Sequence, residues 1–302
     1  MSVDEYAALE LACGEKLVRA GTRWWRRVRP CFYRPLLPFE EISPSDANPP
    51  RACRLGGAQY VVPDGVVANS QMNFILFEKP QSYSLQQLKK NIRYQVRKAE
   101  KAFSVRPLTS ATELASKGHS VYLSFYDRTE YGYRTDRIQY GKFALWAQTL
   151  YAFSNGLVLG AFDKEELVAL SISYLVQDVI FYSTFFSKTE ALSRYVSDLM
   201  LHKIRESAAV LTNVRFIFAG MVGMGPGLDA FYSMRGATMV ARPALLAGNA
   251  FSLFLLRTFL KQSYQKLLGN GAVECGKPVS AGAGVGSGDF VKADCQAGLS
   301  QR

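Results

Sequence analysis

A run of basic residues between positions 89 and 106 is the first candidate for chemistry in this sequence. Its cations are Lys89, Lys90, Arg93, Arg97, Lys98, Lys101 and Arg106. Ammonium and guanidinium groups at this density attract anionic ligands. The chain as a whole also favours anionic partners, because its formal net charge is +11. Nucleic acids, anionic lipid surfaces and phosphorylated cofactors all satisfy this charge, and charge alone does not choose among them.

Apolar residues in and before the same run predict a helix with one buried face. They recur at spacings of three and four residues, at Leu85, Leu88, Ile92, Val96, Ala99 and Phe103. Four of the cations then share another face: Lys90, Arg93, Arg97 and Lys101. Ser84 and Gln87 form a predicted capping box ahead of this helix, and the segment SVRPL after it predicts a strand.

A second basic segment, residues 21–42, places five arginines among five aromatic residues. Mixed arginine and tryptophan side chains can bind nucleic acid or a membrane surface. Buried aromatic anchors, flanked by arginines whose aliphatic parts cover the core, are the commoner arrangement. The Pro/Ser-rich stretch SPSDANPP ends the segment.

Several kinds of site are not predicted. His119 and His202 have no second histidine or cysteine at ligand spacing, so we expect no metal site. No nucleophile-elbow sequence with a Ser-His-Asp order appears, which argues against a hydrolase. The segment GMVGMGPG lacks the Lys-Ser/Thr ending of a phosphate-binding P-loop, and we expect a tight turn there.

Cysteine usage and hydropathy bear on the compartment. The five cysteines form no C-x-x-C pair, and a reduced cytoplasmic location is expected. The N-terminal residues lack the pattern of a secretory signal. No apolar run reaches the roughly 18 residues of a membrane span. The longest, residues 244–256, predicts a core or surface helix, with peripheral membrane contact as the alternative.

The order of elements predicts an α/β protein with a central mixed sheet. We expect residues 1–57 to form a helical and basic-aromatic arm, 58–241 the main domain, 242–268 a C-terminal amphipathic helix, and 269–302 a disordered tail. In the main domain, LVLGAFD, ELVALSISYLV and DVIFYSTFF predict a three-stranded antiparallel meander. A helix over 189–209, the strand VRFIFAG, a glycine-rich turn, a short helix and the strand ATMV follow.

Four of these segments, in this order, resemble the GNAT-superfamily acyltransferases, closest to the branch of the Fem-type aminoacyltransferases. They are NIRYQVRKAEKAFSVRPL, VYLSFYDRTEYGYRT, GAFDKEELVALSISYLVQDVIFYSTFFS and GMGPGLDAFYSMRGATMV, which together span about residues 83–241. The resemblance implies central antiparallel strands that splay apart at the active site, with helices on both faces of the sheet. It also implies an activated acyl donor at the splay and an amine acceptor that attacks its carbonyl carbon.

The resemblance implies roles for particular residues. Near the expected splay, Tyr182, Ser183 and Tyr195 are the predicted catalytic groups, with a tyrosine as the acid for the leaving group. The predicted substrate-binding residues are Arg93, Arg97, Lys101, Tyr126, Arg128, Ser187, Arg194, Gly225, Gly227 and Tyr232. The alternative for the hydroxyl groups of these residues is a purely structural role in a strand or helix. The alternative for Arg128 is an ion pair with Asp127, Glu130 or Asp136.

The donor stays open between acyl-coenzyme A and aminoacyl-tRNA, and no permanently bound cofactor is expected. The usual glycine-rich pyrophosphate loop is absent from SKTEALSRYVSDLM, where Arg194 and a helix N-terminus are the anion-binding features. Tyr232 follows Phe231 where Fem-type relatives often carry lysine. The predicted function is acyl or aminoacyl transfer to a small-molecule or peptide amine. The alternative is a GNAT-like protein without activity that binds RNA or a membrane surface.

Overall fold

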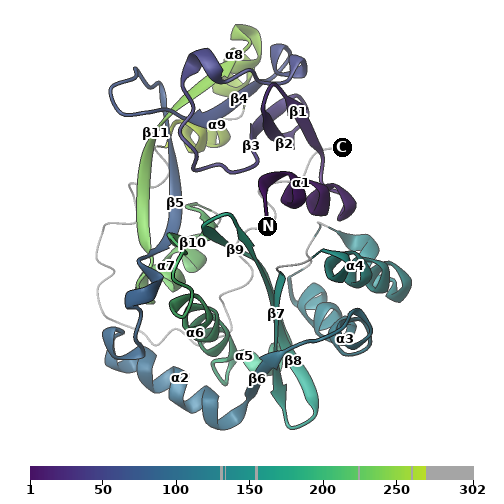
Figure 1. Cartoon of the computed structure of the whole chain (residues 1–302). Helices are drawn as coiled ribbons and strands as arrows, with labels where there is room; N and C mark the ends of the chain where they lie inside the picture. The colour runs from purple at the N-terminus through teal and green to yellow at the C-terminus, as the bar shows by residue number, and fades with distance from the viewer. Residues whose placement is uncertain (130–131, 133, 154–155, 224, 260, 270–302) are drawn as a thin grey trace.

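The computed structural model describes residues 1–129, 132, 134–153, 156–223, 225–259 and 261–269 (Figure 1). The helices are α1 (Val3–Ala12), α2 (Lys90–Ala102), α3 (Ala111–Thr129), α4 (Tyr140–Ala152), α5 (Thr189–Leu192), α6 (Val196–Ala209), α7 (Pro226–Met234), α8 (Ala250–Phe259) and α9 (Lys261–Leu268). The strands are β1 (Leu17–Ala20), β2 (Arg23–Arg29), β3 (Phe32–Pro35), β4 (Gly57–Val61), β5 (Ser70–Glu78), β6 (Ser104–Pro107), β7 (Gly156–Asp163), β8 (Glu166–Val176), β9 (Val179–Ser187), β10 (Phe216–Met221) and β11 (Thr238–Gly248).

These strands form one mixed sheet in the order β1-β2-β3-β4-β11-β5-β10-β9-β8-β7-β6. The pairs β9–β10 and β3–β4 are parallel, and the other neighbours are antiparallel. Figure 1 shows α3 and α4 on one side of the central strands and α2 and α6 on the other. The predicted α/β fold, with an antiparallel meander β7-β8-β9 and helices on both faces, is confirmed.

Each face of the central strands has its own apolar core. Tyr122, Phe143 and Leu170 belong to the core under α3 and α4, while Phe77 and Leu199 belong to the core under α6. All five side chains are almost fully buried. Strand β8 is buried along most of its length because helices cover both of its faces, and its sequence is therefore a nearly continuous apolar run.

The N-terminal segment differs from the predicted arm. After α1 it forms strands β1 to β3, which join the main sheet because β3 pairs with β4. Trp25 and Tyr33 are buried with Tyr60 and Ile42 in a small separate core. The interpretation of the aromatics as buried anchors therefore holds, although the elements that carry them are strands.

Two predicted boundaries at the C-terminal end also differ. Residues 242–248 continue strand β11, so the helical part begins at Ala250 and not at residue 242. The predicted final helix is two helices, α8 and α9. The predicted disordered tail lies, from residue 270 onward, outside the described residues. Within the described part, no helix has the length and apolar character to cross a bilayer.

Two helix predictions were wrong in detail. The basic helix α2 starts at Lys90, and the Ser84 side chain instead caps the preceding 3-10 turn η4 (Leu85–Gln87) by accepting from Gln86 N at 3.3 Å. The predicted buried face of α2 is confirmed, with Ile92, Val96 and Ala99 buried. The predicted helix 189–209 is divided into α5 and α6, because Tyr195 has a left-handed backbone conformation with φ of 65°.

Candidate active site

The central strands β9 and β10 separate part-way along their length. Their parallel pairing joins Val179–Phe181 to Phe216–Phe218 and ends there. Beyond this point β9 stays paired with β8 as far as Ser187, while β10 stays paired with β5 as far as Met221. An irregularity between Phe218 and Gly220 shifts the β5–β10 register at the same level. The splay that the sequence resemblance implied is therefore present, but it opens between two parallel strands and not between antiparallel ones.

The separation leaves backbone groups of two facing strand edges without a ladder partner across the gap. Backbone N–H groups fixed in this way can donate hydrogen bonds to an oxyanion that develops on a carbonyl, and they need no rearrangement to do so. A carbonyl group placed in the gap would meet such donors on β9. The arrangement can therefore serve acyl transfer.

Tyr182 is the first residue of β9 beyond the paired segment. Its ring is perpendicular to that of Tyr232 on α7, with 6.4 Å between centroids. Burial raises the pKa of both phenols. Both hydroxyls therefore stay protonated at neutral pH and can donate a proton but not accept one as a base. Ser183, the next residue, is exposed.

Arg128 and Ser187 are brought together where α3 ends beside the end of β9. Arg128 Nη1 donates to the Ser187 carbonyl oxygen at 3.0 Å and to Thr189 Oγ1 at 3.1 Å. In the described residues no ion pair joins Arg128 to Asp127 or Asp136, and Glu130 lies outside them. The Ser187 hydroxyl is buried and has no hydrogen-bond partner among the described residues. Tyr126 lies partly buried on the same last turns of α3.

Arg194 and Tyr195 lie in the turn between α5 and α6. Arg194 forms an ion pair with Asp163 of β7, and its guanidinium carbon lies 4.4 Å from the centre of the Phe103 ring. Lys98 of α2 lies 5.4 Å from the centre of the Tyr195 ring. Helix α5 has four residues only, whereas the longer helix α6 begins at Val196, directly after Tyr195, so the N-terminus at this turn that could meet an anion is that of α6.

Some cations of α2 have hydrogen-bond partners within the protein, and others are exposed without one in the described residues. Arg93 Nη1 donates to the carbonyl oxygens of Gln86 and Leu88, at 3.0 and 3.2 Å, and so fixes the turn before the helix. Arg97 and Lys101 are exposed, and within the described part of the chain neither has a hydrogen bond or ion pair from its side chain. Arg97 and Lys101 are therefore the α2 cations of the predicted site that stay free for a ligand.

The glycine-rich segment forms the turn between β10 and α7. Gly223 has φ of 89°, and its N–H donates to Asp229 Oδ2 at 2.8 Å. Gly225 is the N-cap residue of α7, and Gly227 lies in the first turn of that helix. The carbonyl oxygen of Gly225 accepts from Asp229 N at 3.0 Å. Met224 lies outside the described residues.

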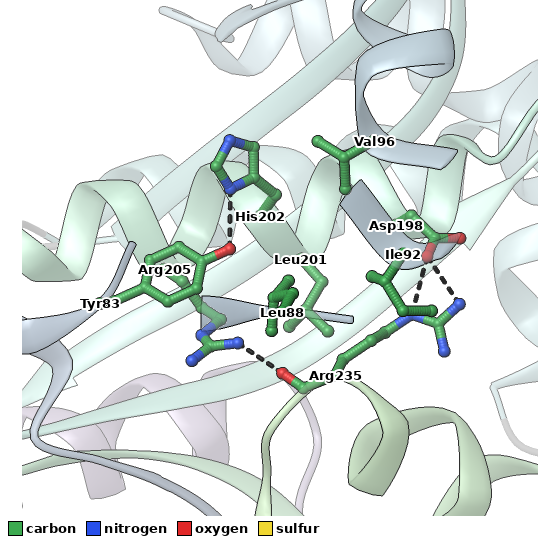
Figure 2. A pocket seen from close by; sticks show the side chains of 9 residues that line it. All are labelled: Tyr83, Leu88, Ile92, Val96, Asp198, Leu201, His202, Arg205 and Arg235. Atoms are coloured by element: carbon green, nitrogen blue, oxygen red, sulfur yellow. Dashed lines mark hydrogen bonds and ion pairs between the residues drawn. The ribbon is translucent and has the colours of Figure 1, made fainter. Parts of the chain in front are cut away.

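A polar cluster between α2 and α6 was not predicted from the sequence (Figure 2). Tyr83 Oη and His202 Nδ1 are 2.8 Å apart, and His202 Nε2 is 3.2 Å from Glu206 Oε1. Asp198 Oδ1 is 2.6 Å from Arg235 Nη2. Tyr83, Asp198, His202 and Arg235 line a cavity with a volume of about 10 Å³, room for about one water molecule. The cluster is an interior network, and its sequence signal is the spacing of His202 and Glu206 by one helical turn.

The described residues contain no group of three or more histidine, cysteine, aspartate and glutamate side chains that could hold a metal ion. His119 is bound through Nε2 to the Ile138 carbonyl oxygen at 2.9 Å. The polar groups gathered around the separation of β9 and β10 are thus hydroxyls, guanidinium groups and backbone amides. Those groups suit acyl chemistry that needs hydrogen-bond donors.

No protein-family model matches the sequence, and no curated protein matches it either. Solved structures do match. The C-terminal domain of a putative lysylphosphatidylglycerol synthetase from Agrobacterium fabrum has 10% identity and a TM-score of 0.54, over 88% of this chain and 92% of that one. The L-PGS from Bacillus licheniformis has 10% identity and a TM-score of 0.55, over 89% and 97%. FemX has 8% identity and a TM-score of 0.55, over 85% and 94%.

The fold is that of the GNAT and Fem-type acyltransferases. The GNAT-like order of strands and the split between β9 and β10 confirm the resemblance found in the sequence. These similarities cover 85 to 89% of this chain and 92 to 97% of the other chains. At 8 to 10% identity they show the fold alone.

Proposed function

We propose that this chain is an acyltransferase that moves an acyl or aminoacyl group from an activated donor to an amine, forming an amide. The observation that carries the proposal is the end of the β9–β10 pairing after Phe181 and Phe218, with Tyr182 at the opening. The gap offers backbone donors for an oxyanion, and Tyr182 offers a protonated phenol. The similar folds include the C-terminal domain of a putative lysylphosphatidylglycerol synthetase, which supports the same class of reaction.

The reaction balances without a metal or redox cofactor. The neutral amine nitrogen attacks the donor carbonyl carbon, and the oxyanion forms between the strand edges. The C–O or C–S bond to the carrier then breaks as the amide C–N bond is completed. The departing oxygen or sulfur takes up a proton, for which Tyr182 is the proposed donor, and the attacking nitrogen loses one. Tyr182 regains its proton from that nitrogen or from solvent.

Of the two donors, we propose aminoacyl-tRNA, with acyl-coenzyme A as the competitor. Arg194, the arginine of the turn before α6, is already paired with Asp163 and is therefore a poor partner for a pyrophosphate at the N-terminus of α6. Arg97 and Lys101 on α2 are open and exposed, as a surface for a long polyanion requires. Charge on an open helix surface suits a tRNA backbone better than a compact cofactor.

The acceptor side of the proposal uses the groups near α3 and α7. Arg128, Tyr126 and the unpartnered hydroxyl of Ser187 are proposed to line the acceptor pocket, together with the turn at Gly225 and Gly227. Ser183 is exposed at the opening and is proposed to contact the reacting groups. Arg93, Arg194, Tyr195 and Tyr232 are proposed to hold this surface in place through the contacts described above.

The donor proposal is tested by the binding of charged tRNA to the full chain at several salt concentrations. Replacing Arg97 and Lys101 by alanine should weaken binding and lower the slope of log affinity against log salt by about 2. The matched control replaces two other exposed cations, Arg51 and Lys142, which have no side-chain polar contact in the described residues. It should leave the slope nearly unchanged. Equal losses in both double variants would overturn a specific role for α2.

Transfer is tested with labelled aminoacyl-tRNA or acyl-coenzyme A and a pool of amines, with an acid-stable amide as the product. Label transferred from tRNA but not from coenzyme A is expected. Tyr182→Phe should lower the rate of product formation about tenfold or more while tRNA binding is kept. Tight tRNA binding with no amide from any donor would favour the alternative function, a binding protein without activity. The open cations on α2 are the observation in favour of that alternative.

A further inference from the structure

Arg34 of β3 holds a positive charge among neutral groups. Gln59 Oε1 accepts from Arg34 Nε at 3.1 Å and from Arg34 Nη2 at 2.6 Å. Met221 Sδ accepts from Arg34 Nη1 at 3.0 Å. The residue is partly buried, and part of its surface stays open to solvent. None of its contacts in the described residues carries a negative charge.

Burying a guanidinium group in such surroundings costs free energy unless an anion or an aromatic ring face stabilises its charge. Burial lowers the pKa of Arg34 to about 10, and no carboxylate of the described residues acts against that shift. Arg205 also lacks a carboxylate partner, but its guanidinium lies 3.7 Å from the centre of the Tyr83 ring and 4.5 Å from that of Phe77. The negative ring faces compensate Arg205. Arg34 has no such ring contact in the described residues.

The donors of Arg34 are only partly used. An arginine has five N–H donors, and the three described hydrogen bonds use one each on Nε, Nη1 and Nη2. One N–H therefore remains on each of the two terminal nitrogens. Unused donors on a guanidinium can bind the oxygens of a carboxylate or phosphate group, and charge-assisted hydrogen bonds of this kind are strong.

The neutral partner also fixes the position of the guanidinium. Gln59 is almost fully buried, and its Nε2 donates to the Leu267 carbonyl oxygen at 2.7 Å. Because Nε2 must face that carbonyl, Oε1 must face Arg34. The charge is thus held in place before any ligand binds, which lowers the entropy lost on binding.

Arg34 lies close to the candidate active site. Met221 is the last residue of β10, the strand that parts from β9 after Phe218. An anion bound by Arg34 would lie beside the end of that strand. We propose that Arg34 binds an oxyanion, a carboxylate or phosphate group, on the acceptor substrate. The assignment to the acceptor rests on the proposed function, because the donor is assigned to the open face of α2.

The test uses the full chain and small oxyanions, with no donor and no transfer reaction. The thermal midpoint is measured in sodium phosphate, sodium acetate and sodium chloride at equal ionic strength. Wild type should gain about 2 to 4 °C over chloride in one of the oxyanions at a concentration near ten times its Kd. A response to phosphate alone identifies a phosphate group on the acceptor, and a response to acetate alone identifies a carboxylate.

Met221→Glu is the decisive variant. Glutamate has nearly the length of methionine, so its carboxylate can take the place of Sδ and pair with Arg34 from within the protein. The variant should keep or raise its midpoint in chloride and lose the gain in oxyanions. Met221→Gln is the matched control, since it keeps the length without the charge and should keep the gain. Arg34→Gln should also lose the gain, because it removes the guanidinium group itself.

Two results would overturn the proposal. The first is an oxyanion response that is the same in wild type, Met221→Glu and Arg34→Gln, because the anion would then bind elsewhere, for example on α2. The second is no response beyond chloride in wild type. Neither result depends on donor binding, so a positive Arg34 result with a negative tRNA result would reject the proposed donor and leave the anion site standing.

Discussion

Arg34 and Arg235 are both surrounded by protein, but only Arg235 has a carboxylate partner. Arg235 Nη2 lies 2.6 Å from Asp198 Oδ1, and its Nη1 donates to the Phe231 carbonyl oxygen at 2.8 Å. Arg34 contacts an amide oxygen and a sulfur atom. The first arrangement binds α7 to α6 and needs nothing further. The arrangement around Arg34 leaves its positive charge without an anionic partner and two of its N–H donors unused, as expected of a group that binds an anionic ligand.

The comparison makes its largest prediction at Arg235. Arg235→Met should lower the free energy of unfolding by about 3 to 5 kcal/mol, because it leaves the Asp198 carboxylate buried without its partner. Urea unfolding measures the loss. The double variant Asp198→Leu, Arg235→Met removes both charges and should recover more than half of it. A loss below about 1 kcal/mol in the single variant would mean that the pair is not what holds α7.

The sequence predicted the buried face of α2 but the surroundings of neither arginine in this comparison. The buried face of α2 follows from local spacing of Ile92, Val96 and Ala99, so periodicity found it. The partners of Arg34 come from positions 59 and 221, and only the β3–β4 pairing and the course of β10 bring them together. Arg34 is one of five arginines in its aromatic segment, and nothing in the sequence indicated that it would lack a carboxylate partner among the described residues.

The break at Tyr195 shows the same limit. No proline or glycine interrupts the helical spacing of residues 189–209, so the sequence predicted one helix. The structure turns the chain at Tyr195, where Lys98 of α2 lies over the Tyr195 ring and Arg194 pairs with Asp163. These tertiary contacts outweigh local propensity. The splay of β9 and β10 came from the family resemblance, since strand spacing alone does not tell where two strands part.

The next prediction concerns His202, which lies in the same polar cluster as the Asp198–Arg235 pair. Burial lowers the pKa of His202 below its usual 6.5. The unfolded chain therefore binds the proton more readily than the folded protein, and folding stability is lost as the pH falls through the usual pKa of histidine. The free energy of unfolding should therefore fall between about pH 7.5 and pH 5.5 through this group.

His202→Gln should flatten that slope, measured by urea unfolding at each pH. His119→Gln is the matched control, because it removes the other of the two histidines of the chain and should leave the slope in place. Slopes are compared and not absolute stabilities, since either change also alters a hydrogen bond. A slope that survives His202→Gln would assign the pH dependence to carboxylates instead.

The smallest effect on stability should come from Arg34 itself. Arg34→Met leaves Gln59 Oε1 without its donor, which costs about 1 to 2 kcal/mol, but it also removes an uncompensated cation from a desolvated position. The two changes oppose each other, so the free energy of unfolding in chloride should stay within about 1 kcal/mol of wild type. A loss as large as that of Arg235→Met would show that Arg34 is held by interactions as strong as an ion pair. The contrast between the two arginines, and with it the argument for a ligand at Arg34, would then fail.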